Sequence, residues 1–197
     1  TITERDQDIW TLLFFHIGNA YGTAALMGNL YAESSMNPQK MTGANAKGVP
    51  ADLYINDVDS GIITKSEFAH DGIAFGLVQW LFYTRKEALY DYAKSLSMSI
   101  GDYRMQINYA LKEIREHYKT VWNALCEATN IKDASDIVLT RYEKPANTSD
   151  SVKKKRADYG QVYYDRFVHS VDPSPTPEPQ PEPTPEPVEK IAYIRTT

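Results

Sequence analysis

Glu33 is the first residue whose position in the sequence suggests chemistry. It lies in the segment GNLYAESSMNP, three positions after Leu30 and seven after Leu26, so a helix would place it at the edge of the apolar face. Partial removal from water raises the pKa of a carboxyl group, and a carboxylic acid that keeps its proton can donate it to a leaving oxygen. Asn37 and Pro38 then end the helix and open one side of the acid to a cleft. We therefore expect Glu33 to act as an acid.

A second group of chemically useful residues lies in HDGIAFGLVQW, residues 70–80. Gly72 and Gly76 allow close approach of the backbone, Gln79 supplies an amide, and Trp80 supplies a flat aromatic face. An amide beside an aromatic ring suits a cleft that binds sugars. His70 lies at the start of this segment, and we expect it to contact a sugar as well.

Taken in order, these segments resemble the lysozyme-like superfamily, and most closely its phage tail lysozyme and endolysin glycosidase domains. AALMGNLYAESSMNP and GIAFGLVQW look like that family's Gly-Asn-x-x-x-Glu-Ser-x-x-x-Pro and Gly-Leu-Val-Gln-Trp segments. RYEKPANTSDSVKKKRADYGQVYYDRF resembles its closing helices, so the resemblance covers about residues 8–168. Goose-type lysozymes and soluble lytic transglycosylases carry a related Glu-Ser and Gly-Leu-Met-Gln pair.

The resemblance implies a mainly α, lysozyme-like helical domain with a small β-hairpin or loop insert beside the cleft. It implies that Glu33 is the general acid acting on a β-1,4 glycosidic bond of peptidoglycan. Gln79 and Trp80 would line the cleft by position, and Tyr142 falls where related enzymes place a tyrosine near the acid. Ser34, the serine of the Glu-Ser pair, is expected to contact substrate.

A glycosidase that uses two carboxylates needs a partner for Glu33 at a set distance. We favour Asp71, because it is joined to the Gln79 segment. If no partner exists, the N-acetyl group of the substrate acts as nucleophile and gives either hydrolysis or a 1,6-anhydro product. The other acidic candidates all lie in the long insert between the two motifs: Asp52, Asp57, Asp59 and Glu67.

Composition argues against several other classes of function. The formal net charge of −5 does not suit a nucleic-acid binder, and the apolar run at 9–15 is too short to cross a membrane. Segment 56–68 resembles a calcium-binding loop, but Val58 stands where a ligand is required, so we expect no metal. Cys126, the one cysteine, is expected in the core. We expect no cofactor.

Hydrophobic periodicity predicts a catalytic domain over residues 1–171. A Pro/Glu-rich linker is predicted over 172–190, and 191–197 would be the start of a truncated wall-binding domain or a disordered tail. Residues 51–56 and 60–68 are expected to form a hairpin. The predicted helices cover about residues 4–18, 20–34, 76–82, 84–97, 101–118, 119–128, 133–143 and 151–169.

The resemblance favours a muramidase-type glycosidase of a phage or prophage lysin, which would hydrolyse the bond between N-acetylmuramic acid and N-acetylglucosamine. The alternatives are a lytic transglycosylase, an N-acetylglucosaminidase, a non-catalytic glycan-binding module on the same fold, and a structural tail-tip subunit whose activity is incidental. We expect a monomeric domain of a modular protein whose partner is the peptidoglycan strand. It would act outside the cell at the bacterial wall, carried by or released from phage, and this chain shows no signal peptide.

Overall fold

Helices make up most of the computed structural model, which describes residues 2–170. The predicted linker and the tail after it lie outside the described residues. The elements, in chain order, are α1 Glu4–Ile17, α2 Ala20–Ser34, β1 Met41–Thr42, η1 Ala44–Ala46, α3 Ala51–Ser60, α4 Lys65–His70, β2 Ala74–Phe75, α5 Tyr83–Ser95, α6 Tyr103–His117, α7 Lys119–Cys126, α8 Ile131–Ile137, η2 Val138–Glu143 and α9 Asp150–Phe167. The prediction of a mainly helical fold with a small insert is confirmed.

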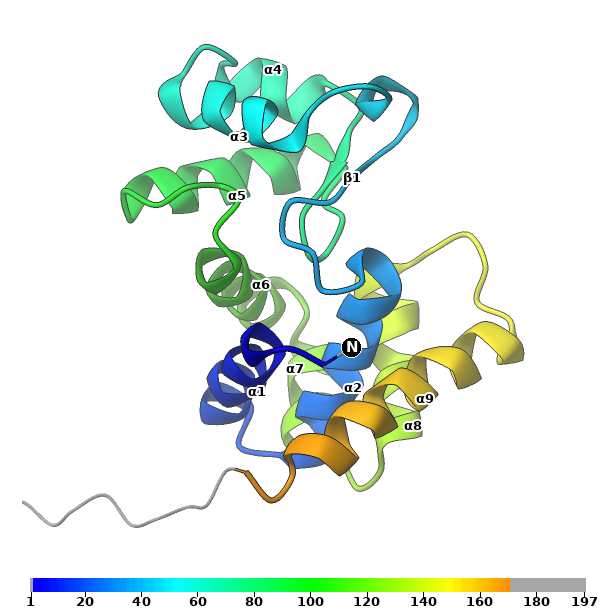
Figure 1. The fold of residues 1–197 in the computed structure, drawn as a ribbon. Helices are drawn as coiled ribbons and strands as arrows, with labels where there is room; N and C mark the ends of the chain where they lie inside the picture. Colours follow the sequence, from blue (N-terminus) through cyan, green and yellow to red (C-terminus); the bar gives the residue numbers. More distant parts are fainter. Residues whose placement is uncertain (1, 171–197) are drawn as a thin grey trace, which may run out of the picture.

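Two groups of elements are seen in Figure 1. Helices α1, α2 and α6–α9 gather in the lower part of the view, and α3, α4 and the two short strands lie above them with α5. The strands pair antiparallel, with Met41 opposite Phe75 and Thr42 opposite Ala74. A further bridge joins Phe75 to Trp80, so the motif segment 76–80 is a turn closed on β2. The helix expected at 76–82 is therefore wrong.

The hairpin expected at 51–56 and 60–68 is also wrong, because these residues form α3 and α4. Tyr54, Ile55 and Val58 recur at helical spacing and are buried together. Gly61 ends α3 in the left-handed conformation, at φ 83°. A capping box between Thr64 and the third residue of α4 then starts the next helix. Tyr54, Ile55 and Phe68, which suggest strands, thus lie on the buried faces of two short helices, whereas Ile62 lies exposed in the turn between them.

Helix α2 lies at the centre of the lower group and is buried continuously from Gly22 to Leu30. Its small residues bring neighbouring backbones close. A Cβ atom at Gly28 would lie 2.4 Å from the carbonyl oxygen of Arg156 and 2.5 Å from the backbone nitrogen of Gly160, both on α9. This close contact sets the middle of α2 against the middle of α9, and it leaves Glu33, in the last turn of α2, within reach of Arg156.

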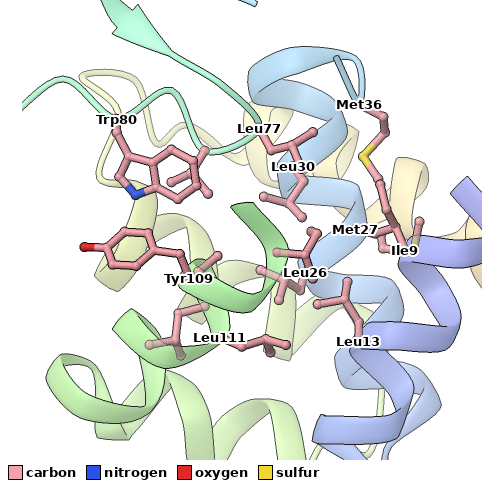
Figure 2. Packing of buried hydrophobic residues seen from close by; sticks show 14 of the residues in the cluster. Ile9, Leu13, Leu26, Met27, Leu30, Met36, Leu77, Trp80, Tyr109 and Leu111 are labelled. Carbon is pink, nitrogen blue, oxygen red and sulfur yellow. The ribbon is translucent and has the colours of Figure 1, made fainter. Parts of the chain in front are cut away.

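The hydrophobic core forms around the same helix. Figure 2 shows Leu26, Met27 and Leu30 of α2 beside Ile9 and Leu13 of α1, with side chains from the 76–80 turn and α6 completing the cluster. All five of these side chains are fully buried. The core therefore fixes α2, and with it Glu33 in its last turn, against the rest of the domain.

Candidate active site

A cavity of about 480 Å³ lies where the upper elements meet the ends of α2 and η2. Its walls come from the last turn of α2, the end of α4, the 76–80 turn, the start of α5 and the segment that follows η2. The lining residues are Glu33, Ala69, His70, Gly72, Val78, Gln79, Leu81, Phe82, Tyr83, Arg85, Glu143 and Pro145.

Glu33 enters this cavity from the last turn of α2, with one fifth of its side chain exposed. Arg156 of α9 donates from Nη2 to Oε1 of Glu33 at 2.5 Å and from Nη1 to Asn29 at 3.2 Å. Lys40 donates to the backbone carbonyl of Glu33 at 2.9 Å. The guanidinium therefore fixes one carboxylate oxygen, and the structure gives the other oxygen no hydrogen bond within residues 2–170.

Glu143 supplies a second carboxylate to the same cavity. Its Oε1 atom is buried and has no hydrogen-bond partner among the described residues. Burial, followed by the negative charge of Glu33, raises the pKa of Glu143 to about 8, although the guanidinium groups of Arg85 and Arg156 oppose this rise. The cavity thus holds a carboxyl group that keeps its proton near neutral pH.

Local backbone geometry explains how Glu143 reaches the cavity. It is the last residue of η2, a π-helical segment, and such segments are frequent at functional sites. Lys144 follows in the left-handed conformation at φ 49°, and Pro145 comes next. Sequence reasoning missed Glu143, although it shares a signal with Glu33: each acid follows an apolar helical run and precedes a proline that ends it.

Gln79 and His70, both predicted from the sequence, also line the cavity. The amide of Gln79 is already used, because its Oε1 accepts from Thr42 at 2.7 Å and its Nε2 donates to the carbonyl groups of Lys40 and Gly76. It therefore ties the 76–80 turn to β1 as well as facing the cavity. The imidazole of His70 stacks on Tyr83, with ring centroids 5.1 Å apart.

Large apolar side chains lie exposed at the edge of the cavity, which sequence reasoning did not identify. Phe82 is 61% exposed, Leu81 is 53% exposed and Tyr83 is 44% exposed. All three line the cavity, and the rings of Phe82 and Tyr83 lie 4.9 Å apart. Neighbouring exposed rings beside a polar cavity are suited to the apolar faces of sugars.

Three predicted substrate contacts lie in the interior instead. Trp80 is fully buried, and Tyr142 and Ser34 are each 1% exposed. Ser34 donates to the carbonyl of Leu30, while Trp80 and Tyr142 both donate to Glu113 of α6. A side chain with almost no exposed surface cannot touch a ligand, so these positions correct the expectation that the three contact substrate.

Asp71, predicted as the partner of Glu33, is likewise not among the lining residues. Its Oδ1 accepts from Lys86 at 2.5 Å and from the backbone nitrogen of Ile73 at 2.8 Å, and the hydroxyl of Tyr54 donates to its Oδ2. Lys86 is fully buried. Asp71 is therefore engaged in a structural ion pair. The alternative partners Asp52, Asp57, Asp59 and Glu67 lie on α3 and α4 and do not line the cavity either.

The described part of the chain offers neither a cluster of metal ligands nor a membrane-spanning helix. Between residues 2 and 170, no set of three or more His, Cys, Asp and Glu side chains is arranged to hold a metal ion. Over the same residues, no helix combines the length and apolar character needed to cross a membrane.

Comparison with known proteins agrees with the two motifs and the helical fold. The family model described as phage tail lysozyme matches residues 4–167, which includes every residue that lines the cavity. A search of curated proteins found no match. The family predicted from the motifs is therefore confirmed, and with it a lysozyme-like helical fold and a lytic activity on peptidoglycan. The chain belongs to the phage tail lysozyme family.

Proposed function

We propose that the chain is a muramidase-type glycosidase that hydrolyses the β-1,4 bond between N-acetylmuramic acid and N-acetylglucosamine, with Glu33 as general acid. One observation carries this proposal. The carboxylate of Glu33, held on one oxygen by Arg156, opens into a cavity of about 480 Å³ that it shares with Glu143. Most glycosidases hydrolyse the glycosidic bond with a pair of carboxyl groups that flank it in one cavity.

The shape and chemistry of the cavity suit a glycan strand. Its volume falls within the range of ordinary ligand sites. The exposed rings of Phe82 and Tyr83 offer apolar faces to sugar rings, and His70 offers a ring nitrogen beside them. The protein would act as a monomeric module on the bacterial wall, from outside the cell.

Digestion of purified Gram-positive peptidoglycan tests the reaction. Wild type, Glu33→Gln and the control Glu127→Gln, an exposed glutamate outside the cavity, would be compared by mass spectrometry of the products. We expect reducing muramic-acid ends from wild type and from the control, and none from Glu33→Gln. Lysis by Glu33→Gln at the wild-type rate would contradict the role of Glu33.

The identity of the new ends separates the alternatives. Anhydro-muramic ends would indicate a lytic transglycosylase, and reducing glucosamine ends would move the cleavage site by one sugar. If the wild-type protein gave no new ends while still binding the strand, it would be a glycan-binding module, and the glycosidase proposal would fail.

A further inference from the structure

We propose that Glu143 is the second catalytic carboxylate of this site and acts as the general base that activates the attacking water. The inference rests on the proposed glycosidase function and deepens it. It replaces Asp71, whose oxygens are occupied by Lys86, Tyr54 and a backbone nitrogen. Glu143 lines the cavity that Glu33 enters, which Asp71 does not.

The first support is an unused polar atom. Oε1 of Glu143 is buried without a hydrogen-bond partner among residues 2–170. Leaving a buried acceptor unsatisfied costs about 1–3 kcal/mol, so a native protein rarely keeps one without a use. A water or a substrate hydroxyl in the cavity would satisfy it. An acceptor of this kind is what a base needs to hold the water that attacks the sugar.

The second support is the set of charges around Glu143. Glu33 on α2 and Glu113 on α6 disfavour its ionised form, whereas Arg85 on α5 and Arg156 on α9 favour it. Burial is the largest effect and raises the pKa of Glu143 to about 8. The two guanidinium groups are therefore the charges that would stabilise Glu143 as a carboxylate.

The two carboxyl groups have different roles in the proposed reaction. In the reacting form of the site, Glu33 is the proton donor, and Glu143 is a carboxylate that the charges of Arg85 and Arg156 favour. Glu33 then passes the proton to the glycosidic oxygen as the bond from that oxygen to the sugar C1 breaks. The water oxygen bonds to C1, and its released proton goes to Glu143. The pair ends with one proton, as it began.

Kinetics of three variants test the base. Glu143→Gln removes the proton acceptor, Glu143→Asp keeps a carboxylate, and Glu127→Gln is the exposed control. On soluble peptidoglycan strands we expect Glu143→Gln to lower kcat about 100-fold or more, the usual contribution of a general base, with little change in KM. Glu143→Asp should recover part of the loss. A kcat for Glu143→Gln close to that of wild type would overturn the proposal.

Rescue of activity by azide distinguishes a general-base role of Glu143 from a purely structural one. Glu143→Ala should regain product formation in sodium azide, because this anion attacks C1 without giving up a proton, and the product is a glycosyl azide. Circular dichroism checks that the variant is folded. If the folded variant is not rescued, the base role is wrong.

Glu33→Gln is measured in parallel, so that the two proposals fail separately. Activity in Glu33→Gln would overturn the proposed function. If Glu33→Gln is inactive while Glu143→Gln is fully active, the glycosidase proposal is retained, and only the proposed role of Glu143 as general base is wrong.

Discussion

The indole nitrogen of Trp80 donates a hydrogen bond to Oε2 of Glu113 at 3.2 Å, inside the core. The same carboxylate accepts from Tyr142 at 2.7 Å and from Arg85 at 2.6 and 2.8 Å. Glu113 therefore joins the 76–80 turn, the residue before Glu143 and one wall of the cavity. The tryptophan of the family motif acts through this contact, because it holds the lining in place without reaching the cavity.

Replacement of Glu113 by glutamine should destabilise the domain. The amide cannot neutralise Arg85, and its NH2 group cannot accept the hydrogen bonds that one carboxylate oxygen now accepts. We therefore expect a loss of about 2–4 kcal/mol in the free energy of unfolding. Urea denaturation measures this loss. The matched control is Glu116→Gln, one turn further along α6 and exposed, which should change the free energy by less than about 0.5 kcal/mol. Equal effects of the two variants would contradict the role of Glu113.

Asp71→Asn should likewise affect stability more than chemistry. It would leave the fully buried Lys86 without its charged partner, and breaking a buried pair costs about 3–5 kcal/mol. We expect a clearly lower Tm, with kcat within about threefold of wild type at a temperature where the variant stays folded. A strong fall in kcat with an unchanged Tm would restore Asp71 as the catalytic partner predicted from the sequence.

The exposed rings beside the cavity should contribute to substrate binding and not to the chemical step. Phe82→Ala removes a ring that is 61% exposed and makes no contact with the catalytic carboxylates that the structure records, so folding should be retained. We expect KM for glycan strands to rise about tenfold with kcat unchanged, since a stacked ring contributes about 1–1.5 kcal/mol. Phe15→Ala, on a ring that is 81% exposed and outside the cavity, is the control. An unchanged KM in Phe82→Ala would place the sugars elsewhere.

The sequence predicts most of the helices because their apolar residues recur with a helical period. It fails where local composition misleads. Tyr54 and Ile55 favour a strand, yet burial against the core and the left-handed C-cap at Gly61 favour α3. The catalytic candidate Glu33 is visible from its motif. The ion pair between Asp71 and Lys86 is not visible in the sequence, because Lys86 lies 15 positions away on another helix. The π-helical segment that brings Glu143 to the cavity depends on packing between distant elements, which a periodic pattern does not encode.

Glu143 also predicts how stability depends on pH. Its pKa is about 8 in the folded protein, against an ordinary value of 4.5. Between these two values the folded state binds more protons than the unfolded state, so this group makes stability fall as pH rises. The contribution is fully present below about pH 4.5 and is lost as pH passes through about 8.

Glu143→Gln removes this dependence, because an amide stays neutral at every pH. We expect the variant and wild type to have similar unfolding free energies near pH 5, and the variant to be more stable by about 3–5 kcal/mol near pH 9. Urea denaturation across this range measures the difference, and Glu127→Gln should follow wild type throughout. A variant that is less active but more stable at high pH is the expected signature of a carboxylate kept for catalysis at a cost in stability. A constant difference between the two curves would mean that Glu143 is not the group that titrates.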